Sequence, residues 1–165
     1  MDTRVDYGIP LLEQVKIQAQ ALVPLLRAFR AELGEERANR IAWQALAEWR
    51  REVARTLGAR FTGSPRERWQ AATQASLPAI LGSVEVKMLK QEEQAVEFDV
   101  VGCQFAQFFR ELGEPDLGFA LTCAFDDTNA EEIGKDEVAF SRTGTIMRGA
   151  ERCDFRYALK KTAGG

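Results

Sequence analysis

The feature of this sequence that most constrains its fold is a change in the spacing of the apolar residues. Before Gly82 they recur every three or four positions, as on one face of a helix, and over residues 84–101 they alternate with polar residues, as in a half-buried strand. The second half of the chain shows the same change again, from helical spacing to alternation. Helices, strands, helices and strands in this order predict an α+β fold, with N-terminal helices packed against an antiparallel sheet.

Two long helices are expected first. The apolar spacing predicts one over about residues 9–33, kinked or divided at Pro24 because proline removes a backbone donor, and ended by Gly34. A second helix is predicted over residues 35–57. The residues expected on its apolar stripe are Ile41, Ala45, Trp49 and Val53.

The stretch "TGSPRERW" predicts the start of a third helix. Ser64 is suited to cap it, Pro65 to occupy its first position, and Glu67 to complete a capping box with the serine. Apolar spacing extends this helix to about Leu81, and Gly82 ends it.

The rest of the chain repeats the order of strands and helices. "VEVKML" and "AVEFDVV" are predicted strands of an antiparallel pair with "KQEEQ" between them. "CQFAQFFREL" predicts a helix that ends at Gly113, and Pro115 opens another, followed by the acidic "DDTNAEE". Two final strands are predicted within residues 137–149 and 153–161, joined by a turn at "GAER". All 165 residues are expected to form a single domain, 1–165.

Composition narrows the function. The chain has no histidine, which excludes Ser-His-Asp triads, Cys-His dyads and His-ligated metal sites made by this chain alone. Its formal net charge of −3 argues against a nucleic acid or an anionic membrane as partner. The apolar runs are too short for a membrane helix and the N-terminus lacks the apolar core of a signal peptide, so we expect a cytoplasmic protein. The sequence identifies no cofactor and leaves the oligomeric state open, a homo-oligomer included.

The cysteines are the first candidates for chemistry. Three cysteines without an export signal are expected to be reduced thiols, and each can simply be a small buried hydrophobe. However, Cys123 and Asp126 can share a helical face, and Cys153 directly precedes Asp154. A carboxylate raises the pKa of a thiol unless arginine compensates, and residues 142–156 are rich in arginine. A metal held by the three cysteines and an aspartate is a weaker alternative, because structural zinc sites usually have closely spaced cysteine pairs.

The final predicted strand has two distinct faces. Cys153, Phe155 and Tyr157 are expected to face one way, and Asp154 and Arg156 the other. If Cys153 faces the core, Asp154 and Arg156 can simply form an exposed ion pair with no function. The sequence supports this interpretation as well as it supports a functional site.

Several stretches resemble one known family. "LVPLLRAFRAELGEERA", "CAFD" and "FSRTGTIMRGAERCDFRY" are similar to the L-2-amino-thiazoline-4-carboxylic acid hydrolase family, over about residues 22–157. The most specific part is a C-terminal set: Arg142, Thr145, Gly149, Cys153, Asp154, Phe155 and Arg156. The resemblance implies hydrolytic opening of a cyclic amidine, in which water adds to C2 of 2-aminothiazoline-4-carboxylate, the C–S bond breaks and N-carbamoyl-L-cysteine forms. A vaguer similarity to 4-vinyl reductase-type ligand-binding domains implies binding of a small molecule without turnover.

Chemistry on such a substrate suggests roles for particular residues. Cys123 is a candidate covalent nucleophile, or Asp126 a candidate general base for water, with neighbouring Asp127 as a competing acid. Asp154 is suited to bind the amidinium nitrogen. The other candidates are Cys153 for catalysis and Arg142, Arg156, Thr145 and Cys103 for substrate binding, with either arginine suited to hold the substrate carboxylate.

Three functions for a small-molecule partner stay open at this point. The first is the hydrolase. The second is a non-catalytic small-molecule-binding or sensory domain, and the third is a family member redirected to another ring-opening or rearrangement step in secondary metabolism.

Overall fold

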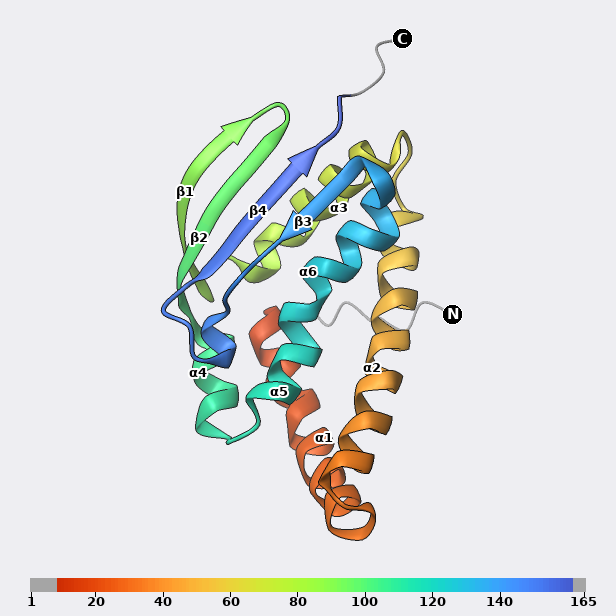
Figure 1. Cartoon of the computed structure of the whole chain (residues 1–165), viewed down its shortest axis with the longest axis vertical. Helices are drawn as coiled ribbons and strands as arrows, with labels where there is room; N and C mark the ends of the chain where they lie inside the picture. Colours follow the sequence, from red (N-terminus) through yellow and green to blue (C-terminus); the bar gives the residue numbers. More distant parts are fainter. Residues whose placement is uncertain (1–8, 162–165) are drawn as a thin grey trace.

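The computed structural model describes residues 9–161 and contains a four-stranded antiparallel sheet in the order β1-β2-β4-β3, with helices packed beside it (Figure 1). Its strands are β1 (Val84–Glu92), β2 (Ala95–Cys103), β3 (Val138–Ser141) and β4 (Cys153–Leu159). The predicted α+β class is therefore confirmed. Residues 1–8, the start of the segment in which no signal peptide is expected, lie outside the described residues.

The first two helices form a long antiparallel pair (Figure 1). α1 (Leu11–Leu33) runs through Pro24 as one helix, and α2 (Glu35–Gly58) follows after a single residue. That residue, Gly34, has a φ of +79°, a backbone conformation that side chains other than glycine rarely adopt. The predicted end of the first helix at this glycine is confirmed.

The buried stripe of α2 differs in part from the predicted one. Trp49 and Val53 pack into the interior as expected, but Ile41 is 47% exposed and Ala45 is also exposed. The residues that continue the stripe toward the N-terminus are instead Ala38, Ala42 and Leu46. Both stripes have helical spacing and share Trp49 and Val53, so periodicity alone could not choose between them.

The third helix begins as predicted. α3 (Pro65–Ile80) is capped by Ser64, whose Oγ accepts a hydrogen bond from the backbone N–H of Glu67 at 3.3 Å. The Glu67 carboxylate in turn accepts one from the backbone N–H of Ser64 at 2.8 Å. This reciprocal pair satisfies two backbone donors that a helix start leaves without partners inside the helix.

The two faces of β4 are arranged as predicted. Cys153, Phe155 and Tyr157 are buried, while Asp154 and Arg156 lie on the opposite face. Aromatic rings fix this inner face to its neighbours. Phe155 stacks on Phe98 with ring centroids 4.6 Å apart, and Tyr157 stacks on Phe140 and packs at a tilt against Trp69, each at 4.8 Å. The sheet therefore buries one face against α3 and leaves the polar residues on the other.

The predicted strand over residues 137–149, with a tight turn at "GAER", is wrong beyond Ser141. A loop over residues 142–152, the 142–152 loop, joins β3 to β4 and contains a short 3-10 helix, η4 (Ile146–Arg148). Side chains of β4 satisfy the loop's backbone donors: Asp154 accepts from Thr143 and Gly144, and the Cys153 sulfur accepts from Ile146. Because these N–H groups already have partners, no strand pairing is needed to satisfy them.

The second helical region is longer than the sequence suggested. After α4 (Gln104–Glu111), the chain turns and forms a helical run from Pro115 to Gly134, the 115–134 helix, which includes the acidic "DDTNAEE" (Figure 1). Its successive parts are α5 (Pro115–Gly118), η1 (Phe119–Cys123), α6 (Ala124–Asn129) and η2 (Ala130–Gly134), of which η1 and η2 are π-helical. A final 3-10 turn, η3 (Lys135–Glu137), leads into β3.

The interior consists of two apolar clusters. One joins α1, α4 and the start of the 115–134 helix around Phe109, Leu117 and Met147, and the other joins α3 and the end of that helix to the inner face of the sheet. The 115–134 helix contributes to both and so sets the position of the 142–152 loop relative to the helices. None of the helices described here has the length and apolar character needed to cross a bilayer.

Candidate functional site

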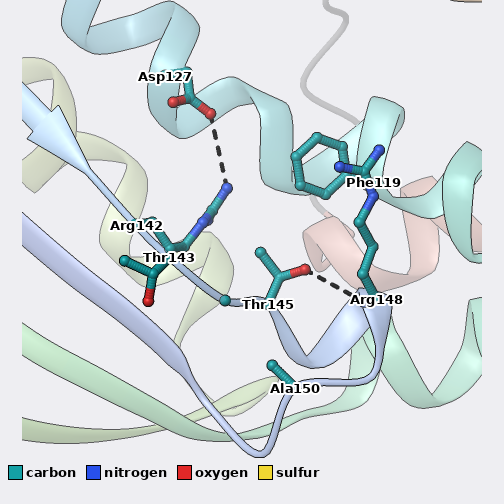
Figure 2. A pocket seen from close by; sticks show the side chains of 8 residues that line it. Phe119, Asp127, Arg142, Thr143, Thr145, Arg148 and Ala150 are labelled. Carbon is teal, nitrogen blue, oxygen red and sulfur yellow. Dashed lines mark hydrogen bonds and ion pairs between the residues drawn. The ribbon is translucent and has the colours of Figure 1, made fainter.

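A pocket of about 330 Å³ lies between the 142–152 loop and the 115–134 helix (Figure 2). We call it the loop pocket. Its lining residues are Phe119, Asp127, Arg142, Thr143, Gly144, Thr145, Arg148 and Ala150. The volume is at the lower end of the range for small-molecule sites, and the charged residues of the lining are two arginines and one aspartate. The pocket is therefore suited to a small polar ligand.

Arg142 is fixed at the wall of this pocket, with only 4% of its side chain exposed. Its Nη1 donates to Asp126 Oδ2 at 2.7 Å, and its Nη2 donates to the backbone carbonyl of Cys123 at 3.1 Å. Nη2 also lies 3.8 Å from Asp127 Oδ2 (Figure 2). Three rings surround the guanidinium, those of Phe155, Phe140 and Phe119, with centroids 5.0, 5.3 and 5.8 Å away. With these contacts Arg142 holds the two aspartates in place.

The π-helical segment η1 presents two carbonyls to arginines from other elements. The carbonyl of Cys123 accepts from Arg142, and that of Ala120 accepts from Arg50 Nη1 of α2 at 2.6 Å. A π-helical turn interrupts the regular α-helical hydrogen-bond pattern and is frequent at functional sites. Here it places Phe119 at the pocket and Cys123 beside Arg142.

Asp126 is the acid with the most perturbed environment near the loop pocket, although it is not one of the residues that line it. Burial raises its pKa from the ordinary value to about 6, while the charge and hydrogen bond of Arg142 act in the opposite direction. Its side chain is still 32% exposed. An aspartate that titrates near neutral pH and remains accessible to water is suited to moving protons.

The three thiols lie in the same region but do not line the loop pocket. Burial raises the pKa of each, that of Cys123 to about 12, and the nearby Asp126 carboxylate adds to the effect on each thiol. Asp126 therefore acts electrostatically on Cys103, Cys123 and Cys153 alike. Each thiol is protonated at neutral pH in this arrangement.

Two of these thiols have structural roles. The Cys103 sulfur accepts from the backbone N–H of Ala106 at 3.4 Å and so caps the start of α4. The Cys153 sulfur accepts from the backbone N–H of Ile146 at 3.2 Å and holds the 142–152 loop on β4. Cys123 has only a weaker contact, 3.6 Å from the Thr122 hydroxyl. It is therefore the thiol that contributes least to holding the structure.

Asp154 and Arg156 are separated from this group, on the outer face of β4. Asp154 accepts from the backbone N–H groups of Thr143 and Gly144 at 2.9 and 2.8 Å and from the Thr143 hydroxyl at 2.6 Å. Although its slight burial acts the other way, these bonds lower its pKa to about 2. Arg156 donates to the carbonyls of Phe98 and Phe155 and to Asp99, at 2.8 to 3.0 Å. The two residues do not pair with each other, and neither lines the loop pocket.

Thr145 and Arg148 complete the pocket wall. The Thr145 hydroxyl accepts from the backbone N–H of Arg148 at 3.3 Å and caps η4, while its residue is 7% exposed (Figure 2). The Arg148 guanidinium lies 3.6 Å from the centroid of the Phe119 ring and pairs with Asp116 at 3.4 Å. More than half of the Arg148 side chain is exposed, so it can bind a ligand.

Sequence reasoning missed several residues of the pocket. Phe119 carried no signal, because an isolated aromatic residue in a helix is usually part of a core. Arg148 was considered only as a charge that compensates a thiol. It lies three residues after Thr145 in the stretch that resembles the family, but the direction of its side chain depends on η4, a turn that the sequence analysis did not predict.

The donor groups do not form a metal site. Among the residues that the structure describes, no three or more histidine, cysteine, aspartate or glutamate side chains are placed to hold a metal ion. The alternative of a metal bound by the three cysteines and an aspartate therefore gains no support from this geometry.

Comparisons with known proteins point to one family. The model of the family described as L-2-amino-thiazoline-4-carboxylic acid hydrolase matches residues 14–157. No curated protein matches this chain. Among solved structures, the phenol-responsive sensory domain of the transcription activator PoxR, crystallised with phenol, is similar at 15% sequence identity over 84% of this chain and 73% of that one, with a TM-score of 0.42. Since the family model covers most of the sequence, the chain belongs to the L-2-amino-thiazoline-4-carboxylic acid hydrolase family.

Proposed function

We propose that this protein hydrolyses a small cyclic amidine, of which 2-aminothiazoline-4-carboxylate is the type. The observation that carries the proposal is the pair formed by Asp126 and Arg142. The aspartate has a pKa of about 6, and the arginine that holds it lines a pocket of substrate size. Membership of the family supplies the reaction class. The oxygen of water bonds to C2 and the bond from C2 to sulfur breaks. One proton of the water goes to the sulfur, which becomes a thiol, and the other goes to the ring nitrogen, so that C2 becomes the carbonyl carbon of the carbamoyl group.

Asp126 acts as the general base in this proposal. At neutral pH most of it is ionised, so it can accept a proton from the attacking water and later return it to the leaving sulfur. Its exposed fraction of 32% allows a water molecule to reach it. Arg142 is a positioning residue, since its hydrogen bonds are already used on Asp126 and on the Cys123 carbonyl.

A covalent role for Cys123 is less well supported. The thiolate is the nucleophilic form of cysteine, and burial raises the pKa of this thiol to about 12. Attack by Cys123 would therefore first require Asp126 to remove its proton. Asp126 has to take a proton in either route, but the covalent route also forms an enzyme-bound intermediate that water must hydrolyse in a second step. For this reason we assign the nucleophile to water.

Asp127 and Arg148 are the groups best placed to bind the substrate. Both line the loop pocket, and more than half of each side chain is exposed. Asp127 can accept from the amidinium nitrogen, a role that Asp154 is badly placed to fill because both of its oxygens hold the loop. Arg148 can bind the substrate carboxylate in the bidentate manner of guanidinium groups, since Arg156 lies outside the pocket.

The test is a turnover assay with 2-aminothiazoline-4-carboxylate. Product is detected as new thiol after subtraction of the protein's own cysteines, and by mass spectrometry as a gain of one water. Asp126→Asn should lower kcat by about a hundredfold or more, since general-base catalysis typically contributes that much. Asp136→Asn, which alters an exposed aspartate paired with Lys160 at 3.0 Å, is the matched control and should leave kcat unchanged. An Asp126→Asn variant as active as the wild type would remove Asp126 from the mechanism.

A second candidate function is favoured by one observation, that neither the three thiols nor Asp126 is among the residues that line the loop pocket. In a non-catalytic small-molecule-binding domain, the pocket would hold the amidine by Asp127 and Arg148 without converting it. The same samples distinguish the two functions, because saturable binding with unchanged substrate after prolonged incubation would favour the binding domain.

A further inference from the structure

A second pocket, of about 180 Å³, adjoins the first on the side of α2. We call it the α2 pocket. Its lining residues are Trp43, Arg50, Asp116, Phe119, Ala120, Ala124 and Arg148. The stacked pair of Arg148 and Phe119 lines both pockets and so forms a wall that they share. None of the roles proposed above for the hydrolase uses Trp43 or Arg50.

The charges in the α2 pocket are not balanced. Arg148 is paired with Asp116 at 3.4 Å. Arg50 donates from Nη1 to the Ala120 carbonyl, but its Nε is buried and has no hydrogen-bond partner among the described residues. A buried donor without an acceptor is costly. Because this Nε is closed to solvent, an anion in the pocket would have to bind the Nη groups, and a guanidinium prefers a planar anion that accepts two of its N–H groups. Arg50 is therefore the group in this pocket that lacks an anionic partner.

Burial also acts on the charge of Arg50. It lowers the pKa of this guanidinium, and the carboxylate of Asp127 acts in the opposite direction. A bound anion would add to the effect of Asp127 and offset part of the cost of burying the charge.

The walls of the α2 pocket are suited to a flat ring. Trp43 and Phe119 provide aromatic surface, and Ala120 and Ala124 are too small to obstruct it. A cavity of roughly 150 Å³ is large enough to admit benzene, and this pocket is slightly larger. One ring bearing one small substituent fills it.

We propose that the α2 pocket is a separate binding site for a planar ring carboxylate, with the carboxylate on Arg50 and the ring between Trp43 and Phe119. Binding there involves no covalent step and does not depend on the hydrolysis proposed for the loop pocket. The recognised features are the negative charge and the flat ring together, so a neutral ring of the same shape binds less well.

The experiment uses benzoate and its neutral analogue benzamide as probes of the full chain. The indole N–H signals of the tryptophans are followed by two-dimensional NMR during titration, and the signal of Trp43 is identified from its loss in Trp43→Phe. Benzoate should shift the Trp43 signal saturably, with an affinity about tenfold or more above that of benzamide, since a hydrogen bond to a charged group typically contributes that much. A Trp43 signal that does not respond to benzoate would overturn the proposal.

Variants at neighbouring arginines separate specific binding from general charge. Arg50→Met should weaken benzoate binding by about tenfold or more and leave that of benzamide nearly unchanged. Arg51→Met, the next residue of α2, which is exposed and paired with Glu48, should bind benzoate like the wild type. Equal loss of benzoate binding in both variants, or no loss in Arg50→Met, would contradict a site on Arg50.

If Arg50→Met does not fold, Arg50→Lys serves instead. It retains the charge and loses the bidentate contact, so weaker benzoate binding is again expected.

Discussion

Asp126 and Asp154 are two aspartates near the same loop, yet their surroundings shift their pKa values in opposite directions. Burial raises the pKa of Asp126 to about 6, whereas backbone and hydroxyl donors of the 142–152 loop lower that of Asp154 to about 2. The first is poised for proton transfer near neutral pH and the second stays ionised. Sequence alone offered both as catalytic candidates, because each follows a cysteine closely and the number of hydrogen bonds to a carboxylate is not visible in a sequence.

At the residue scale, the role of Asp126 predicts a pH dependence of the rate. A general base works in its ionised form, so kcat/KM should rise with pH on an acid limb with an apparent pKa near 6 and level off above it. The measurement is kcat/KM for thiol release between about pH 5 and pH 8. The residual activity of Asp126→Asn should lack this limb, and a wild-type rate that is flat through this range would contradict the assignment.

The role of Asp154 predicts an effect on stability. Asp154→Ala removes the acceptor of three hydrogen bonds and should lower the free energy of unfolding by about 1–3 kcal/mol. Because the folded pKa is lowered, the Asp154 contribution is present above the ordinary pKa and disappears as the pH falls toward about 2. Denaturant unfolding at neutral and acidic pH measures this, and Asp154→Asn, which retains one acceptor oxygen, should lose less. A difference between wild type and Asp154→Ala that does not shrink in acid would contradict the explanation.

At the scale of elements, the site depends on the 115–134 helix and the loop that packs on it. Most helices and strands were predictable, since apolar spacing and cap residues such as Ser64 and Gly34 act locally. The 142–152 loop was not, because its conformation is fixed by Cys153 and Asp154, which pair with it from the next strand. The π-helical turn at η1 also has no local sequence signal, and it provides the carbonyl that holds Arg142.

A substitution of Gly118, the residue before η1, tests how closely the 115–134 helix must approach its neighbours. A Cβ there would lie 2.5 Å from Phe109 Cγ and 2.7 Å from the Met147 sulfur, so Gly118→Ala should lower the free energy of unfolding by about 1–3 kcal/mol through overpacking. Gly58→Ala is the matched helical control, because its Cβ would meet only the Ile133 side chain at 3.1 Å, and its effect should be smaller. Chemical denaturation of both variants makes the comparison, and equal stability would show that the 115–134 helix can shift freely.

At the scale of the whole molecule, Arg66 joins parts of the chain that are far apart in sequence. This residue, 6% exposed, donates to the carbonyls of Glu93 in the β1–β2 turn and Lys160 after β4, both at 2.6 Å, while its backbone N–H donates to Glu137 at 2.8 Å. Buried charged residues are rare unless paired, and here one guanidinium fixes the start of α3 to one end of the sheet.

Arg66→Lys should lower the free energy of unfolding by about 2–4 kcal/mol, because a single ammonium cannot reach both carbonyls and stays buried. The comparison is Arg51→Lys on the surface of α2, which should change it by less than about 0.5 kcal/mol. Thermal or denaturant unfolding gives both values. If Arg66→Lys proves as stable as Arg51→Lys, the three segments are held together by other contacts.

The fold class and the family were accessible from the sequence, but the pocket was not. Its two walls come from residues 119–127 and 142–150, and which side chains face the space between them depends on a π-helical turn and on a loop held by β4. Residues such as Arg156 match the family pattern and yet lie on the other face of the sheet, because strand alternation separates neighbours that the sequence groups together.

The central claim is that Asp126, held by Arg142 beside the loop pocket, activates water without an imidazole. The most direct test is turnover of 2-aminothiazoline-4-carboxylate in water labelled with heavy oxygen, followed by mass spectrometry of the product. We predict that the wild-type protein forms N-carbamoylcysteine with one labelled oxygen in its carbamoyl group and that Asp126→Asn forms almost none. Substrate that binds to the wild-type protein and is recovered unchanged would contradict the claim.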